Sequence, residues 1–159
     1  MLSRVILNGE DMVTYQIEDY LENLPGINRL IEEHYDELCV TKDFPLEPNY
    51  EAYERTYNSD LIRFISCKDD GVMVGYILFI ISPHLHYKSC LTAFEDLYFL
   101  RKEYRQGRTG IRLFQFAEKV LKEQGINRII YHTKVHSDNS KLFEYLNYKF
   151  TDKVFTKLL

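Results

Sequence analysis

Cysteine is scarce in this 159-residue chain, and several other common signals are missing with it. The three cysteines, Cys39, Cys67 and Cys90, are isolated and odd in number, which excludes a disulfide framework and fits a reducing cytoplasm. They also lack the paired spacing of a zinc site, so we expect no metal. No apolar run reaches the roughly 20 residues of a membrane span, and the N-terminus is too short and too acidic for a signal peptide. We therefore expect a cytoplasmic protein that does not enter the membrane.

An excess of positive charge is also missing. The chain has 20 Lys and Arg against 24 Asp and Glu, a net charge of -4, which disfavours nucleic acid and anionic membranes as partners. The 13 tyrosines and 10 phenylalanines favour a packed core with a lined cleft and argue against disorder. Because the chain contains no repeat, linker or low-complexity segment, we expect one domain over residues 1–159.

Hydrophobic periodicity and turn residues predict the secondary structure. In the N-terminal part we expect a strand at 4–7, a helix at 12–24 that Pro25-Gly26 ends, a helix at 27–39, and a short helix after Pro48. Further on we expect strands at 61–67, 72–81, 91–100 and 127–133, a loop at 84–89, a helix after 137–140, and a closing hairpin at 148–150 and 153–158. Edge strands of that hairpin are a place where two copies can pair as a homodimer.

The most informative stretch runs from Glu95 to Leu121. Residues 97–100 form an apolar strand, a basic loop with two glycines follows, and from Ile111 the apolar residues repeat at helical spacing. The first N–H groups of a helix have no internal partner, and the helix dipole adds about half a positive charge there, so phosphates bind at such a position. The arginines of the loop are either a solvated surface beside a capped helix or part of an anion site.

The same residues resemble the central motif of the GNAT superfamily, the acetyl-CoA-dependent N-acetyltransferases. That motif runs Arg/Gln-x-x-Gly-x-Gly/Ala between a central strand and its helix. Arg105 and Gly110 match its ends, whereas Arg108 stands at the middle glycine and Gly107 comes one position early. The chain is similar in particular to short phage and prophage members, through residues 71–76, 84–87 and 116–118.

The resemblance implies an α/β fold of the GNAT type: a mixed, mostly antiparallel sheet with a splayed parallel central strand pair, flanked by helices. It implies acetyl-CoA as the co-substrate, with the pantetheine arm entering the gap of the splayed pair. The implied cofactor-binding residues are Phe99, Leu100, Arg105, Gln106, Gly107, Arg108, Thr109, Gly110, Ile111 and Asn139.

Acetyl transfer to an amine needs a base, because an amine with a pKa near 10.4 is mostly protonated at neutral pH. Glu95 and Asp96 lie on the central strand and should point to opposite faces. The resemblance favours Glu95 as the base; alternatively, the pair only bonds loop backbone or an arginine. It also implies an oxyanion donor among the main-chain N–H groups near Leu100, and acceptor contacts for His34, Glu37, His86, Tyr87 and Asp96.

The general acid is a second point at which the chain departs from the family pattern. The tyrosine that usually protonates the departing thiolate is replaced by Phe143. Tyr145 is our candidate and Tyr131 an alternative, and a thiol with a pKa near 8.5 can also leave without an acid.

We therefore expect an acetyl-CoA-dependent N-acetyltransferase that acts on a primary amine by direct attack in a ternary complex. A non-catalytic acyl-CoA-binding regulatory module is the alternative that the missing tyrosine supports. A nucleotide-binding domain is a third reading, which the absence of Gly-Lys-Ser/Thr argues against. The acceptor stays open between a small amine, an antibiotic, a protein amine and a base amine of nucleic acid, and the acidic charge favours a cationic one.

Overall fold

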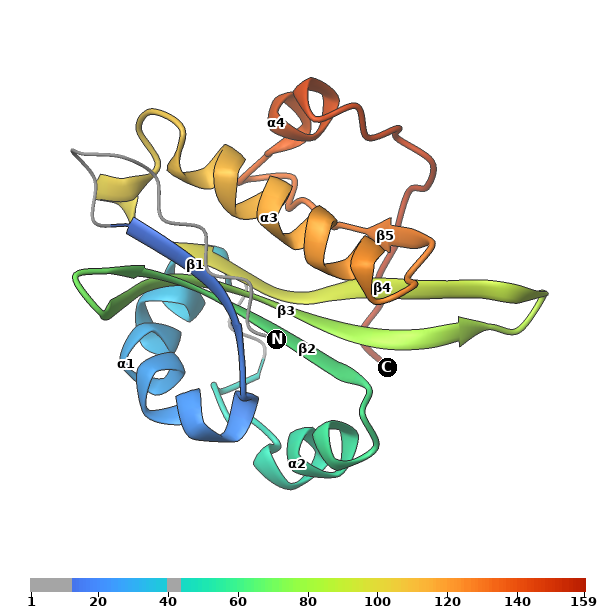
Figure 1. Cartoon of the computed structure of the whole chain (residues 1–159), viewed down its shortest axis with the longest axis horizontal. Coiled ribbons are helices and arrows are strands. Elements are labelled where there is room, and N and C mark those ends of the chain that lie inside the picture. The colour runs from blue at the N-terminus through green and yellow to red at the C-terminus, as the bar shows by residue number, and fades with distance from the viewer. Residues whose placement is uncertain (1–12, 40–43) are drawn as a thin grey trace.

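A five-stranded sheet in the order β1-β2-β3-β4-β5 organises the protein (Figure 1). The computed structural model describes residues 13–39 and 44–159. The strands are β1 Val13–Glu18, β2 Ile62–Asp69, β3 Val72–His84, β4 Tyr87–Leu100 and β5 Arg128–Ile130. The helices are α1 Tyr20–Leu38, α2 Tyr50–Asn58, the 3-10 helix η1 Lys102–Tyr104, α3 Thr109–Glu123 and α4 Ser140–Tyr145. The first four strands are antiparallel and β4–β5 is parallel, which confirms the expected mixed α/β fold.

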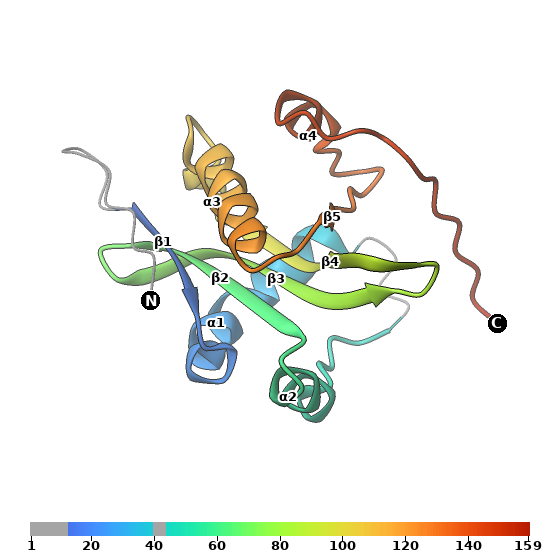
Figure 2. The ribbon, with the colours of Figure 1, turned by 45° about the vertical axis from the view of Figure 1, so that its right-hand side comes forward.

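Helices cover both faces of the sheet (Figure 2). On one face, α1 packs against a cluster that includes Phe64, Tyr76 and Phe99. On the other, α3 packs on a second cluster that includes Phe79 and Phe114. Side chains alternate along each strand, so the apolar residues of β2, β3 and β4 supply both clusters. Within the described residues, no helix has both the length and the apolar character needed to cross a bilayer.

The parallel pair β4–β5 is short. Its register joins Thr92 to Arg128, Ala93 to Ile129, and Phe94 to Ile130. β4 continues to Leu100. Of its last six residues, all but Asp96 pair with β3 on one side, and none has a strand of the described chain on the other. The pair therefore splays after Phe94, as the resemblance implied, and leaves an open strand edge.

A β-bulge at Asp96 sits where the splay begins. Phe79 pairs with Glu95 and Leu78 with Leu97, which leaves Asp96 as the extra residue on β4. A bulge places two consecutive side chains on the same face, and Leu97 accordingly packs with the α1 cluster. Glu95 stays on the α3 face. Glu95 and Asp96 thus lie on opposite sides of the sheet, as alternation predicted, and the bulge places Leu97 on the same face as Asp96.

Gly75 brings β3 close to the end of β4. A Cβ atom there would lie 2.7 Å from Leu100 Cδ1 and 2.8 Å from the Phe99 carbonyl oxygen. Contacts this short do not occur in folded proteins, so only glycine fits. The close approach fixes the last residues of β4 beneath the loop that follows.

The predicted helix at 12–24 is wrong. Residues 13–18 form β1 instead, because they pair with β2 and thereby bury Tyr15. Asp19 then caps α1, which continues through Pro25 to Leu38. Pro25 is exposed and removes only one helical hydrogen bond, while Gly26 allows close packing on Met73, since a Cβ there would lie 2.8 Å from Met73 Cε. The predicted strand at 4–7 lies outside the described residues.

The predicted end of a strand at Ser82-Pro83 is also wrong. β3 runs on to His84, and the expected loop at 84–89 shrinks to the turn at Leu85-His86. β2 pairs with β3 only as far as Ile80, so Pro83 lies where β3 has a single neighbour, and strand edges tolerate proline. The result is a long β3–β4 ribbon that projects beyond the helices (Figure 1).

The closing hairpin does not form. Residues 148–159 contain no strand, and the side chains of Phe150, Val154 and Phe155 are exposed. The homodimer argument rested on edge strands in this segment, so it loses its structural basis. The predicted strand at 127–133 shortens to β5, because only three residues pair with β4.

Candidate active site

The N-terminus of α3 lacks the caps that the other long helices have. Asp19 and Asn49 accept hydrogen bonds from the first turns of α1 and α2, and both of those turns carry an acidic residue. Arg108 occupies the N-cap of α3, makes no side-chain capping bond, and is followed by a first turn without acidic residues. Gly107, directly before it, has φ +81°, which glycine adopts without strain. The first amides of α3 are therefore left for an external anion.

Basic side chains surround this helix start, but they are not equivalent. Arg101 pairs with Glu33 and Arg105 with Glu37, both on α1. In the described part of the chain, Lys102, Arg108 and Arg112 form no ion pair. These three cations are therefore available to a phosphate group, whereas the charge of Arg105, which we predicted as a cofactor ligand, is already neutralised.

The open edge of β4 presents main-chain donors. The Arg101 N–H bonds the Val74 carbonyl on β3 at 3.0 Å. Because amides alternate in direction along a strand, the N–H groups of Leu100 and Tyr98 point away from β3, toward the splay. Gly110 lies beside the same edge: a Cβ there would be 3.7 Å from Leu100 Cδ2 and 3.9 Å from the Tyr98 hydroxyl. The helix start and the strand edge thus adjoin.

Glu95 lies where the two strands part. Its side chain is 12% exposed, and Oε2 accepts the His132 N–H at 3.2 Å and lies 3.7 Å from His132 Nδ1. Burial raises the pKa of the Glu95 carboxyl, and the His132 hydrogen bond opposes part of that increase. A buried carboxylate with a raised pKa beside an open edge is suited to accept a proton at neutral pH.

Asp96 faces the other side of the sheet. The Tyr53 hydroxyl of α2 donates to Asp96 Oδ2 at 2.5 Å. Burial and the Asp96 carboxylate together raise the pKa of Tyr53 well above its ordinary value. The ring of Tyr53 also packs on Tyr20, with centroids 5.6 Å apart. Asp96 therefore orders α2 against the sheet and lies on the opposite face from Glu95.

His34 is a core residue. It is 7% exposed, its Nδ1 lies 2.9 Å from the Tyr76 hydroxyl, and its ring stacks on Phe99 at 5.2 Å. Burial lowers the pKa of His34 to about 4. The structure thus places His34 inside the α1 cluster, where an acceptor could reach it only by displacing packed side chains.

The lowered pKa of His34 gives a testable pH dependence. The unfolded chain protonates this histidine near pH 6.5 and the folded protein only near pH 4, so its contribution to stability is present above pH 6.5 and is lost as the pH falls toward 4. We expect this group to lower the free energy of unfolding by about 3 kcal/mol over that range. Urea unfolding of wild type and His34→Gln across these pH values should show the difference, and parallel curves would contradict it.

Other predicted acceptor residues are widely separated. Glu37 faces the loop, where the ion pair with Arg105 lowers the pKa of its carboxyl. His86 and Tyr87 lie at the tip of the β3–β4 ribbon, about 26 Å along β4 from Glu95 at 3.3 Å per residue. The structure therefore does not bring His86 and Tyr87 together with Glu95.

Neither of the two tyrosines considered as the general acid is well suited to protonate the departing thiolate. Tyr131 stacks on Phe143 at 5.0 Å, and burial raises its pKa well above 10, which weakens it as an acid. Tyr145 is 68% exposed on α4. Asn139, predicted to contact the cofactor, is the N-cap of α4, and its N–H donates to Thr133 Oγ1 at 2.7 Å.

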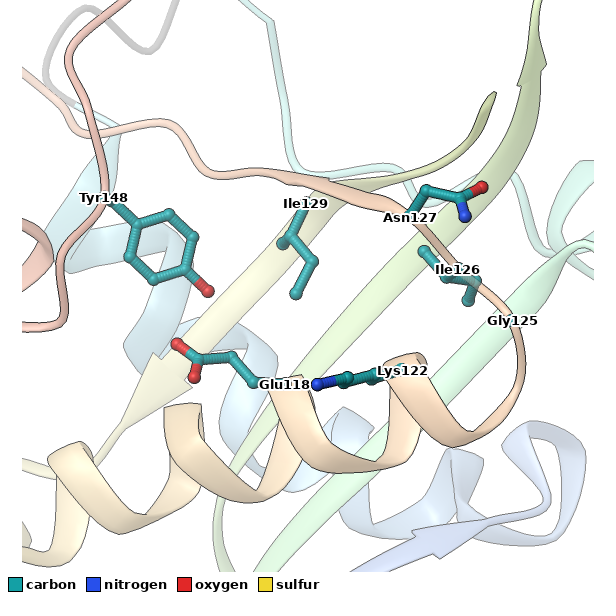
Figure 3. A pocket seen from close by; sticks show the side chains of 7 residues that line it. All are labelled: Glu118, Lys122, Gly125, Ile126, Asn127, Ile129 and Tyr148. Carbon is teal, nitrogen blue, oxygen red and sulfur yellow. The ribbon is translucent and has the colours of Figure 1, made fainter. Parts of the chain in front are cut away.

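A separate hollow lies between the C-terminal half of α3 and β5 (Figure 3). The Glu118 carboxylate and the Tyr148 hydroxyl point toward each other across it. Burial and this carboxylate raise the pKa of Tyr148. The hollow is at the opposite end of α3 from Gly110, so it is distinct from the helix start.

The described residues contain no group of three or more His, Cys, Asp or Glu side chains placed to hold a metal ion. His132 and His136 are four residues apart, but they lie in non-helical chain, where that spacing does not place both on one face.

Sequence reasoning missed two ion pairs that join α1 to the segment before α3. Glu33 and Glu37 are four residues apart on α1, and their partners Arg101 and Arg105 are four apart around η1. Matching i,i+4 spacings in two segments were the available signal, because residues four apart share a helix face.

These features agree with a match to a known family. The model of the Acetyltransferase (GNAT) family matches residues 17–146, which is most of the chain. The chain therefore belongs to the GNAT acetyltransferase family. No curated protein sequence matches it.

Solved structures share the fold. An aminoglycoside acetyltransferase from an uncultured soil metagenomic sample, in complex with sisomicin, has a TM-score of 0.72 at 13% identity and covers 93% of this chain and 97% of its own. A transcriptional regulator from Bacillus halodurans C-125 has a TM-score of 0.74 at 18% identity, with coverage of 92% and 99%. A predicted acetyltransferase from Clostridium acetobutylicum, with acetyl-CoA, has a TM-score of 0.70 at 10% identity, with coverage of 92% and 96%.

Proposed function

We propose that the protein, as a single domain over residues 1–159, transfers an acetyl group from acetyl-CoA to a primary amine. The observation that carries the proposal is the uncapped start of α3 directly beside the open edge of β4. The amides of residues 107–111 would hold the diphosphate, with Lys102, Arg108 and Arg112 nearby. The N–H groups of Tyr98 and Leu100 would hold the pantetheine arm. The acetyl-CoA complex of the Clostridium neighbour supports this choice of co-substrate.

The chemistry follows from where Glu95 lies. In a ternary complex, Glu95 takes a proton from the ammonium group of the acceptor, directly or through a water. The freed amine nitrogen attacks the thioester carbonyl carbon, and main-chain N–H groups at the edge stabilise the resulting oxyanion. The C–S bond then breaks, and the products are an amide and the thiol of CoA.

Protonation of the thiolate is the least demanding step. A thiol pKa near 8.5 lets the thiolate leave with little assistance. We assign the proton donor to Tyr145 and not to Tyr131, because the raised pKa of Tyr131 makes it the poorer acid. The contribution of this donor to the rate should accordingly be small.

The acceptor is proposed to be a small-molecule or protein amine. The net charge of -4 supports a cationic acceptor and argues against nucleic acid. The aminoglycoside acetyltransferase neighbour, which was solved in complex with sisomicin, supports the same class. We also place the chain with the short phage-type members, on the motifs at 71–76, 84–87 and 116–118.

A non-catalytic acyl-CoA-binding module is the second candidate. Phe143 in place of the usual tyrosine and the exposure of Tyr145 favour it. The neighbour named as a transcriptional regulator has the same fold.

Thiol release separates the two candidates. The protein is incubated with acetyl-CoA and a panel of amines that includes polyamines, aminoglycosides and peptides with free N-termini or lysines. We expect release of free thiol with at least one amine and formation of the acetylated product. Tight binding of acetyl-CoA without turnover on any amine would favour the module, and no binding would contradict both.

A further inference from the structure

Arg105 is the side chain that joins three parts of the site. Its Nε donates to the Leu100 carbonyl at 2.6 Å, and its terminal nitrogens donate to the two oxygens of Glu37 at 2.5 and 2.7 Å. The guanidinium carbon lies 5.6 Å from the centre of the Phe99 ring. One planar group therefore connects α1, the end of β4 and the start of the loop.

These contacts make Arg105 a poor phosphate ligand. A carboxylate that accepts from both terminal nitrogens of the guanidinium neutralises its charge. It also occupies the paired N–H groups that a phosphate would use. The ion pair is partly shielded from solvent, since the side chains of Arg105 and Glu37 are 35% and 20% exposed. Arg105 is therefore committed to protein partners.

The hydrogen bond from Arg105 to the Leu100 carbonyl lies on the open edge of β4. In a strand, the N–H and C=O of one residue point to the same side. The Leu100 carbonyl that Arg105 holds is thus on the same side as the Leu100 N–H, next to the splay. Fixing that carbonyl also fixes the orientation of the neighbouring donor.

We propose that Glu37 is a positioning residue for the acetyl-CoA site. By clamping Arg105, Glu37 sets the Leu100 edge and the start of the phosphate loop at the spacing that the co-substrate requires. This inference rests on the proposed function, because it assumes that acetyl-CoA binds along that edge.

Direct binding of phosphate by Arg105 predicts the opposite change in CoA affinity. If Arg105 bound phosphate directly, Glu37 would compete for its guanidinium, and Glu37→Gln would free the arginine and tighten CoA binding. If Glu37 positions the site, the same substitution loosens the clamp and weakens binding. Loosening the clamp should weaken CoA binding roughly tenfold, which corresponds to about 1.4 kcal/mol.

A matched control exists one helical turn away. Glu33 on α1 bonds Arg101 at 2.8 and 3.3 Å, so this pair links the same two segments. Arg101 does not bond the Leu100 carbonyl, which accepts its hydrogen bond from Arg105. Glu33→Gln removes the same negative charge near the anion site and should leave CoA affinity equal or slightly tighter.

The experiment is calorimetric titration of CoA into wild type, Glu37→Gln, Glu33→Gln and Arg105→Lys, well below each melting temperature. We expect weaker binding in Glu37→Gln and weaker still in Arg105→Lys, because lysine keeps the charge but cannot hold Glu37 and Leu100 together. Wild-type affinity or tighter binding in Glu37→Gln overturns the inference, as does wild-type affinity in Arg105→Lys, which covers the case in which Glu37→Gln fails to fold.

A second readout uses S-acetylpantetheine, which has no diphosphate. Positioning of the Leu100 edge predicts that Glu37→Gln lowers kcat/KM for this truncated substrate too, by roughly the same tenfold. A loss confined to acetyl-CoA would show that Glu37 affects the diphosphate site alone and not the Leu100 edge, and would reject the inference. Failure of wild type to bind CoA would instead reject the proposed function.

Discussion

Replacing Gly110 with aspartate should reduce CoA affinity by on the order of 100-fold or more while the protein stays folded. At about 4 Å and an effective dielectric constant near 20, two like charges repel by about 4 kcal/mol, and each 1.4 kcal/mol is a factor of ten in affinity. The fold tolerates a side chain there because a Cβ would make contacts of 3.7 and 3.9 Å, which are ordinary. An acidic residue in the first turn of a helix also stabilises it, so the melting temperature should not fall.

The control for this substitution is Gln115→Glu, which adds the same charge on the exposed face of α3, beyond the first turn. We expect its CoA affinity to stay within a few-fold of wild type, because the dipole effect is confined to the helix end. Equal losses in both variants would show a bulk charge effect. Unchanged affinity in Gly110→Asp would place the diphosphate elsewhere.

Glu95→Gln should lower kcat by about 10²- to 10³-fold and leave the affinity for CoA unchanged. Glutamine preserves the shape and can still accept the His132 N–H, but it cannot take a proton from the acceptor amine. The matched control is Glu18→Gln, since Glu18 is a comparably buried carboxylate at 16% exposure that pairs with Lys68 on the far side of the sheet. Steady-state kinetics with the best amine would measure the difference, and a loss below tenfold would remove Glu95 as the base.

The activity of wild type and that of Glu95→Gln should depend on pH in different ways. Wild-type activity should fall as the pH drops through the raised pKa of Glu95, because only the ionised carboxylate accepts a proton. Glu95→Gln should lack this decrease in activity at low pH.

The stability of the fold should depend on pH in the opposite sense. A carboxyl group whose pKa is raised in the folded state contributes stability below its ordinary pKa, and this is lost as the pH rises through the folded value. Glu95→Gln should therefore melt at a higher temperature than wild type at pH 7 and not at pH 4; equal melting at both pH values would contradict this.

Local patterns predicted those parts of the fold in which pattern and tertiary packing agree. The alternation from strand to loop to helix around Gly107 and Gly110 predicted the end of β4 and the start of α3, because turn glycines and a helical apolar face are local properties. The amino-acid sequence of residues 12–24 was compatible both with apolar residues at helical spacing and with their alternation along a strand. Pairing with β2 decided for β1, and pairing is a long-range contact that no local pattern contains.

The candidate site likewise contains a part that the sequence predicted and a part that it did not. The phosphate loop follows from neighbouring residues, so it could be found in the sequence. The pairing of Glu37 with Arg105 joins residues 68 positions apart and depends on how α1 crosses the sheet. The buried position of His34 could not be predicted for a related reason. Its helical face was recognised as apolar, but its burial against Tyr76 and Phe99 is set by the bulged register of β4.

A crystal structure of the protein with coenzyme A is the most direct measurement of the central claim. We expect diphosphate oxygens within hydrogen-bonding distance of the N–H groups of residues 107–111, and a pantetheine amide bonded to the Leu100 edge between β4 and β5. The sulfur should lie closer to Glu95 than to Asp96. Coenzyme A bound at another surface, with the start of α3 and the edge of β4 both free, would contradict the account.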